Sequence, residues 1–268
     1  QVTCRPLMFS MSLHEPFTLN PNAAFAELMK ASIEARAEAY ADPAFRARAK
    51  EIWTTMVGLV PRFDTYEIME SVAHPDLVGR KLSAIAAEMG KEPFDALLDL
   101  TLQEPGLRLR VRAIVANDDV DGITKLLADP GCTLGLSDAG AHVGQLCDAP
   151  MPTDLLGNWV RERGVLTLEA AIRKLTGVPA DLFGFAGRGY LQPGCAADVT
   201  VFDPDTVAPG PVRRVRDFPA DSERLTADAP SGMRHVLVNG TPIQLDGTPL
   251  PDVLDARPGQ LVKPAPRG

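Results

Sequence analysis

The feature of this sequence that most constrains its fold is the alternation of short apolar runs with helix-length segments over residues 1–186. Apolar runs at residues 2–11, 107–116 and 132–136 predict buried strands. Apolar residues that recur every three or four positions predict helices, which begin near residues 20, 42, 82, 94, 119, 154 and 168. Strands separated by helices of this size are typical of a parallel α/β arrangement.

Local start and stop signals support the predicted helices. Asn20-Pro21 and Asp42-Pro43 each place a proline directly after a residue that caps helix N-termini well. Gly58 and Pro61 then end the second of these helices. The helices in this part of the chain should therefore be short and sharply bounded.

The character of the sequence changes after Phe185. From Gly187 the chain is rich in turn residues and leads into a strand predicted at Asp198–Phe202. Asn239-Gly240, which separates two apolar runs, predicts a tight hairpin because both residues accept a positive φ. Residues 206–232 are rich in Pro, Asp and Arg and are expected to form a long surface loop.

The composition excludes several classes of protein. The 27 Lys and Arg residues against 35 Asp and Glu residues give a net charge of −8, which argues against nucleic acid or an anionic membrane surface as a partner. The basic patch at Arg213, Arg214 and Arg216 is too short to change this. No apolar run approaches the roughly 18 residues that span a bilayer. Four widely spaced cysteines favour a reducing cytoplasm over a disulfide framework.

Polar side chains that could carry chemistry gather at residues 135–142. Asp138 directly follows a predicted strand, at the end where parallel α/β barrels place catalytic groups. Gly140 and its small neighbours leave room for a substrate to approach the backbone, and Ser137 and His142 add polar groups. From position alone, a cap on the next turn accounts for Asp138 equally well, and a hydrogen-bonded loop histidine is the favoured account of His142.

Five segments together resemble the C-terminal part of the amidohydrolase superfamily, in its D-aminoacylase (N-acyl-D-amino-acid deacylase) branch. They are residues 134–142, 174–177, 183–194, 197–204 and 235–240. The resemblance implies the C-terminal portion of a TIM-like (β/α)8 metal-dependent hydrolase barrel, here residues 1–186 with a helical insertion. It also implies a small β domain, a composite sandwich, here residues 187–268.

The same resemblance implies the chemistry. Asp138 would bind catalytic zinc, at a site of one or two ions, and would exchange protons with the attacking water. Ser137, Gly140 and His142, the small and polar residues beside it in the sequence, are the candidate substrate-binding residues. Zinc lowers the pKa of its bound water to about 7 and polarises a carbonyl. The expected partner is a small linear amide such as an N-acyl-(D-)amino acid, with neither nucleic acid nor membrane; a homo-oligomer stays open.

The sequence also departs from the family pattern. The chain has four histidines and no His-x-His pair, so the other metal ligands cannot be placed on it. Three or four predicted strands precede residue 187, whereas a complete barrel needs eight strands and about 250 residues. We therefore expect the chain to be the C-terminal half of an enzyme, inactive without an N-terminal half that supplies most ligands. Two alternatives remain, a cyclic-amide hydrolase of the dihydroorotase or hydantoinase type and a non-catalytic protein that has lost the metal site.

Three further side chains are candidates for the active site. His14 and His74 are each favoured as loop or turn residues. Cys147 lies in the loop after Asp138 and is expected to be a packed thiol, because no basic neighbour in the sequence lowers its pKa.

Overall fold

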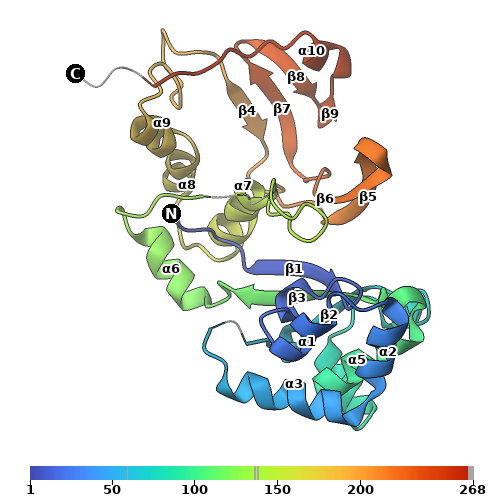
Figure 1. Ribbon diagram of the computed structural model, residues 1–268. Helices are drawn as coiled ribbons and strands as arrows, with labels where there is room; N and C mark the ends of the chain where they lie inside the picture. Colours follow the sequence, from blue (N-terminus) through green and yellow to red (C-terminus); the bar gives the residue numbers. More distant parts are fainter. Residues whose placement is uncertain (59, 136, 138, 265–268) are drawn as a thin grey trace. The chain divides into compact units, whose positions relative to one another are not determined.

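The computed structural model describes residues 1–58, 60–135, 137 and 139–264, and it divides into two compact units (Figure 1). The inserted unit comprises Pro6–Asp118 and Gly144–Leu146. The host unit comprises Gln1–Arg5, Asp119–Val143 and Cys147–Gly268. Together they form a mixed α/β protein. None of the helices in the described residues is long and apolar enough to cross a membrane.

The inserted unit packs helices against a three-stranded antiparallel sheet with the strand order β1-β3-β2. Its strands are β1 (Leu7–Ser12), β2 (Glu67–Glu70) and β3 (Arg110–Ala116). Its α-helices are α1 (Ala23–Leu28), α2 (Ile33–Ala41), α3 (Pro43–Thr55), α4 (Leu82–Glu88) and α5 (Pro93–Gln103). Short 3-10 helices occupy Phe17–Leu19, Phe63–Thr65, Pro75–Leu77 and Pro105–Leu107.

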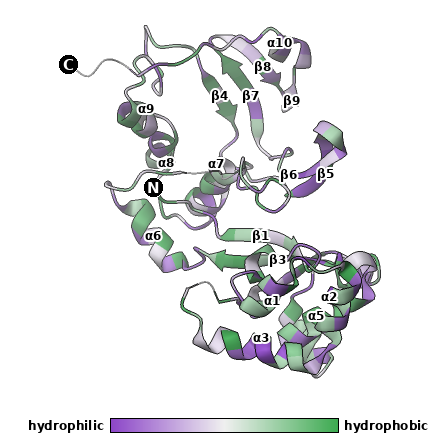
Figure 2. Cartoon of the chain, in the orientation of Figure 1, coloured by the Kyte–Doolittle hydropathy of each residue, from purple (hydrophilic) through white to green (hydrophobic). Residues whose placement is uncertain are grey.

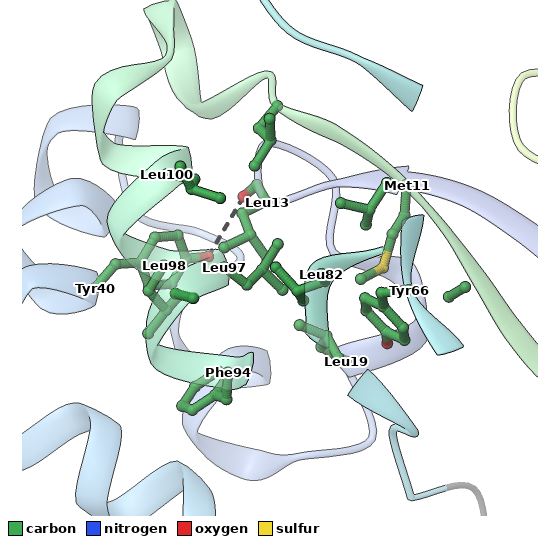
Figure 3. Packing of buried hydrophobic residues seen from close by; sticks show 14 of the residues in the cluster. Met11, Leu13, Leu19, Tyr40, Tyr66, Leu82, Phe94, Leu97, Leu98 and Leu100 are labelled. Atoms are coloured by element: carbon green, nitrogen blue, oxygen red, sulfur yellow. Dashed lines mark hydrogen bonds between the residues drawn. The ribbon is translucent and has the colours of Figure 1, made fainter. Parts of the chain in front are cut away.

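The core of the inserted unit is aromatic and aliphatic and lies between α5 and the strands (Figure 3). Phe25 is fully buried, and its ring centre lies 5.3 Å from that of Phe45 and 5.7 Å from that of Tyr40. The Tyr40 hydroxyl donates to the carbonyl of Leu13 at 3.4 Å, so this buried polar group has a partner.

The host unit contains more separate pieces of secondary structure. Its helices are α6 (Val120–Ala128), α7 (Met151–Asp154), the π-helix Leu155–Glu162, α8 (Leu168–Leu175), α9 (Gly177–Phe183), the 3-10 helix Pro219–Asp221 and α10 (Pro251–Asp255). Its strands are β4 (Val199–Phe202), β5 (Arg213–Phe218), β6 (Ser222–Thr226), β7 (Met233–Val238), β8 (Thr241–Leu245) and β9 (Thr248–Pro249). One sheet has the order β4-β7-β8-β9, and β5 and β6 form a separate hairpin.

Several local predictions are confirmed. Asp42 caps α3, since its side chain accepts a hydrogen bond from the backbone N–H of Ala44 at 2.9 Å. Asn239 and Gly240 have φ values of 50° and 80° and connect β7 to β8 as a hairpin. Both features depend on side chains within a few residues of the turn or cap, which is why the sequence predicts them well.

The first predicted helix and strand differ from the structure in their bounds. α1 begins after Asn22 rather than Asn20, because the buried Asn22 side chain accepts from Ala24 N–H and donates to the carbonyl of Ala49. The run predicted as one strand over residues 2–11 is interrupted before β1. Pro6 lies in the interruption and has no N–H to donate to a strand partner.

The parallel arrangement is wrong for the named strands. Each strand pairing in the described residues is antiparallel, and the one parallel bridge joins Val2 and Leu134. The predicted strand 132–136 is reduced to that bridge, and its Leu136 lies outside the described residues. Alternation of helices and strands fixes neither strand order nor direction, and here β1 and β3 pair antiparallel although all five helices of the unit lie between them.

The surface loop predicted at 206–232 is also wrong, because β5 and β6 form a hairpin inside it. Figure 2 shows this hairpin in the purple of hydrophilic residues. Its strands carry arginines that pair with carboxylates across the hairpin, including Arg214 with Glu223 and Arg224 with Asp217. Opposite charges on neighbouring strands stabilise the pairing without the apolar alternation that marks a strand in sequence.

Candidate active site

The predicted site residues lie in the loop that follows Leu134, in the host unit. Asp138 lies outside the described residues. Ser137, Gly140 and His142 are exposed. His142 has a φ of 47°, in the left-handed region that a non-glycine residue seldom adopts, so the loop turns sharply there.

The segment before the loop is held by a short parallel pairing with the first residues of the chain. The N–H of Val2 donates to the carbonyl of Thr133 at 2.9 Å, and the N–H of Gly135 donates to the carbonyl of Val2 at 3.0 Å. The two segments run in the same direction through the Val2–Leu134 bridge. Arg5 lies three residues after Val2, and Ser137 lies three residues after Leu134. The two residues therefore share the carboxyl end of this pairing.

A hydrogen bond closes the base of the loop. The backbone N–H of Asp148 donates to the carbonyl of Ser137 at 2.8 Å, so residues 137 and 148 lie side by side although ten residues separate them. The loop is thus anchored on both sides of its base.

A buried charge cluster lies against this base. Arg5 Nε donates to Asp148 Oδ1 at 2.8 Å, and Arg5 Nη1 lies 3.3 Å from Asp154 Oδ1. The side chains of Arg5, Asp148 and Asp154 are 11%, 6% and 12% exposed. Burial raises the pKa of Asp154, and the positive charge of Arg5 opposes that shift. Burial also raises the pKa of the adjoining Cys4 to about 12, so this thiol stays protonated and unreactive.

An open hollow of about 280 Å³ adjoins the loop. It is lined by two residues of the loop and three of the β5–β6 hairpin, namely Ala139, Val143, Asp217, Arg224 and Leu225. The N–H of Leu225 donates to the carbonyl of Val143 at 2.7 Å and joins the loop to the edge of β6. Ala139, which lines the hollow, follows Asp138 in the sequence.

The charged rim of this hollow is a hydrogen-bonded ion pair. Arg224 Nε and Nη2 donate to the two carboxylate oxygens of Asp217 at 2.7 and 2.6 Å. These hydrogen bonds lower the pKa of Asp217 and raise that of Arg224, so both groups are charged at neutral pH.

The remaining candidate side chains lie elsewhere or are packed. His14 Nδ1 lies 3.0 Å from the carbonyl of Gly106, His74 Nε2 lies 3.0 Å from Gln103 Oε1, and His235 is in β7. Cys147 is buried, as expected of a packed thiol. It nevertheless has a basic neighbour that its flanking sequence does not reveal, since it is near enough to Arg224 for the two side chains to interact electrostatically.

The donors needed for a metal are incomplete in the described residues. Across residues 1–58, 60–135, 137 and 139–264, no group of three or more His, Cys, Asp or Glu side chains could hold a metal ion. These residues therefore do not form a metal site by themselves. The expected ligand Asp138 lies outside them.

Two features of the loop were missed in the sequence. Arg5 lies inside the apolar run 2–11 that predicts a strand. A charged residue in such a run indicates a buried acidic partner, because buried arginines are rarely unpaired. Arg224 gives a weaker signal, since its partner Asp217 is on the other strand of an unpredicted hairpin.

Comparison with known proteins places these motifs in a family. The model of the amidohydrolase family matches residues 12–244. N-acyl-D-glutamate deacylase of Alcaligenes xylosoxydans xylosoxydans is 34% identical over 210 residues, which are 75% of this chain and 37% of that protein. D-aminoacylase of the same organism is 36% identical over 175 residues, which are 63% and 31% of the two chains.

A solved structure gives a similar match. It is N-acyl-D-glutamate deacylase from Bordetella bronchiseptica complexed with zinc and a phosphonate inhibitor, which is 31% identical, with a TM-score of 0.42 over 77% of this chain and 44% of that one. The chain spans roughly one third of the length of the curated relatives above. Because the family model covers most of the sequence, the resemblance inferred from the five motifs is confirmed, and the chain belongs to the amidohydrolase family.

Proposed function

We propose that the whole protein is a metal-dependent hydrolase that cleaves the carbon–nitrogen bond of a linear amide, such as an N-acyl-D-amino acid. The observation that carries this proposal is the 34–36% identity to two enzymes named as deacylases of such substrates. The chain would form the C-terminal portion of a (β/α)8 barrel with residues 187–268 as a small β domain. The parallel bridge between Val2 and Leu134 supports this, because neighbouring barrel strands pair in that direction.

In this proposal Asp138 is the central residue. Its carboxylate would hold zinc, as one or two ions, and accept a proton from the attacking water before passing it to the leaving nitrogen. Bound zinc would supply a hydroxide at neutral pH and polarise the scissile carbonyl. Ser137, Gly140 and His142, which are exposed in the same loop, would contact the substrate. The other metal ligands would come from outside the described residues.

The proposal is tested by assaying the protein expressed from its complete coding sequence. N-acetyl-D-amino acids should release acetate and the free amino acid, the L enantiomers should react more slowly, and a chelator should abolish the reaction until zinc is restored. Hydrolysis of dihydroorotate or a hydantoin instead would favour the cyclic-amide alternative. No turnover of either class by metal-loaded protein would support the non-catalytic alternative.

We also propose that the hollow lined by Ala139, Val143 and the β5–β6 hairpin receives the carboxylate end of the substrate. Asp217 fixes the Arg224 guanidinium at the rim of the hollow, and a guanidinium binds carboxylates with strong, directional hydrogen bonds. Replacing Arg224 by Gln should raise KM by about 10- to 100-fold, since a hydrogen bond to a charged group contributes about 1.5–3 kcal/mol. Steady-state kinetics with an N-acetyl-D-amino acid measures this change.

Arg213 provides a matched control on the same hairpin. Its side chain pairs with Asp228 as that of Arg224 pairs with Asp217, but it does not line the hollow. Arg213→Gln should therefore leave KM within about twofold of the native value. The loss of its exposed ion pair should lower the free energy of unfolding by at most about 1 kcal/mol. Equal rises in KM for both variants would mean that the hairpin acts only as a scaffold.

A further inference from the structure

A cluster of three buried charged side chains has no role in the mechanism proposed above. Arg5 lies between Asp148 and Asp154 and reaches each of them within 3.3 Å. All three side chains are at most 12% exposed. Removing charged groups from water costs free energy, and this cost is offset only where the groups are well paired and hydrogen-bonded.

The cluster is located at the base of the loop that carries Asp138. Arg5 follows the residues that pair with Thr133–Gly135, so it lies at the same end of the pairing as Ser137. Asp148 is the residue whose N–H closes the loop onto the carbonyl of Ser137. One residue thus joins the loop to Ser137 through its backbone and to Arg5 through its side chain.

Asp154 extends the same connection into the next helix. It is the last residue of α7 and leads directly into the π-helix Leu155–Glu162. The N–H of Met151 in turn donates to the carbonyl of Asp148 at 2.9 Å. The N-terminal segment 1–5, the end of the loop and the last residue of α7 therefore meet at Arg5.

We propose that Arg5 is a positioning residue that holds the base of the Asp138 loop through Asp148 and Asp154. The inference rests on the proposed function, in which Asp138 must be held accurately relative to the reacting atoms. A small displacement of such a group is enough to lower the rate substantially. Arg5 acts through Asp148 and the Ser137 carbonyl and is not itself assigned a contact with substrate.

Hydrogen exchange at the Asp148 amide tests the proposal without any assay of activity. Arg5→Met should speed the exchange of this amide by about tenfold or more, because the variant loses a hydrogen bond to a charged group next to it. Arg5→Lys keeps the charge but loses the planar pair of donors and should give an intermediate value. Should Arg5→Met fail to fold, Arg5→Lys and Asp148→Asn provide the same measurement with smaller disturbance.

Kinetics of the whole enzyme then tests the consequence for the reaction. Arg5→Met should lower kcat and weaken zinc affinity, each by about 10- to 100-fold, as is usual when a residue supporting a metal ligand is lost. KM for an N-acetyl-D-amino acid should change less than kcat, since the carboxylate contact proposed for Arg224 is on the β5–β6 hairpin and not on this loop. A merely structural role would lower the melting temperature and leave kcat of the folded fraction unchanged.

Arg46 is a matched control in the inserted unit. It too is a largely buried arginine between two aspartates, lying 2.8 Å from Asp99 and 3.6 Å from Asp95. Arg46→Met should destabilise the protein but leave kcat, zinc affinity and exchange at Asp148 as in the native protein.

The outcomes separate this inference from the function on which it rests. Unchanged exchange at Asp148 in Arg5→Met, or faster exchange with native kcat and zinc affinity, would overturn the positioning role. Inactivity of every variant and of the native protein would contradict the proposed function. Faster exchange in the Arg5 and Asp148 variants but not in Arg46→Met would then still support the contact by which Arg5 holds the base of the loop.

Discussion

Replacing Asp138 by Asn is expected to lower kcat of the whole enzyme by about 10²-fold or more, the usual effect of losing a group that transfers protons in the transition state. The carboxamide keeps the size of the side chain but cannot take a proton from water at neutral pH. It is also a poorer ligand for zinc, which prefers charged carboxylate oxygens. The measurement is kcat with an N-acetyl-D-amino acid, together with the zinc content of the purified variant.

Asp121→Asn is the control for this substitution. Asp121 is an exposed carboxylate in the first turn of α6 and has no role in the proposed site. Its substitution should leave kcat unchanged. Near-native turnover by Asp138→Asn with a full zinc content would remove Asp138 from the mechanism and direct attention to another residue of the loop.

Replacing Phe25 by Ala is expected to lower the free energy of unfolding by about 3–5 kcal/mol, the range observed when a buried aromatic ring is deleted. Phe25 has no exposed surface, and the rings of Tyr40, Phe45, Trp53 and Phe94 have centres within 6.3 Å of its own. Its loss would leave a cavity among rings contributed by α2, α3 and α5. Urea denaturation followed by far-UV circular dichroism measures the change.

Phe17 is the matched control in the same unit. It is 40% exposed, and its ring centre lies 5.5 Å from that of Phe9. Phe17→Ala should cost about 1 kcal/mol or less. Equal losses from both substitutions would show that the ring cluster around Phe25 is not the stabilising core of this unit.

The sequence predicts those parts of the fold that depend on neighbours along the chain. The cap at Asp42 and the Asn239-Gly240 turn each place the deciding side chain within two residues of its partner. The bounds of α5 and α8 follow from apolar spacing in the same way. Strand direction in the β1-β3-β2 sheet depends on packing across more than a hundred residues, and no local pattern encodes it.

The candidate site divides along the same line. Ser137, Asp138, Gly140 and His142 are candidates from the sequence because they lie close together after an apolar run, and their roles stay predictions. The residues that hold or border their loop could not. Arg5 is 143 positions from Asp148, and Arg224 belongs to a hairpin whose charges conceal its strands.

The interleaving of the two units gives the chain an order of assembly. Residues 6–118 are continuous and almost complete the inserted unit, so on a ribosome they can bury their core while the rest is still being made. Arg5 and Asp148, by contrast, cannot meet until 143 further residues have been synthesised. The entropic cost of closing this loop is smaller once the residues inside it have folded, because less flexible chain then separates Arg5 from Asp148. Early folding of the inserted unit should therefore favour the later contact between Arg5 and Asp148, which belong to different segments of the host unit.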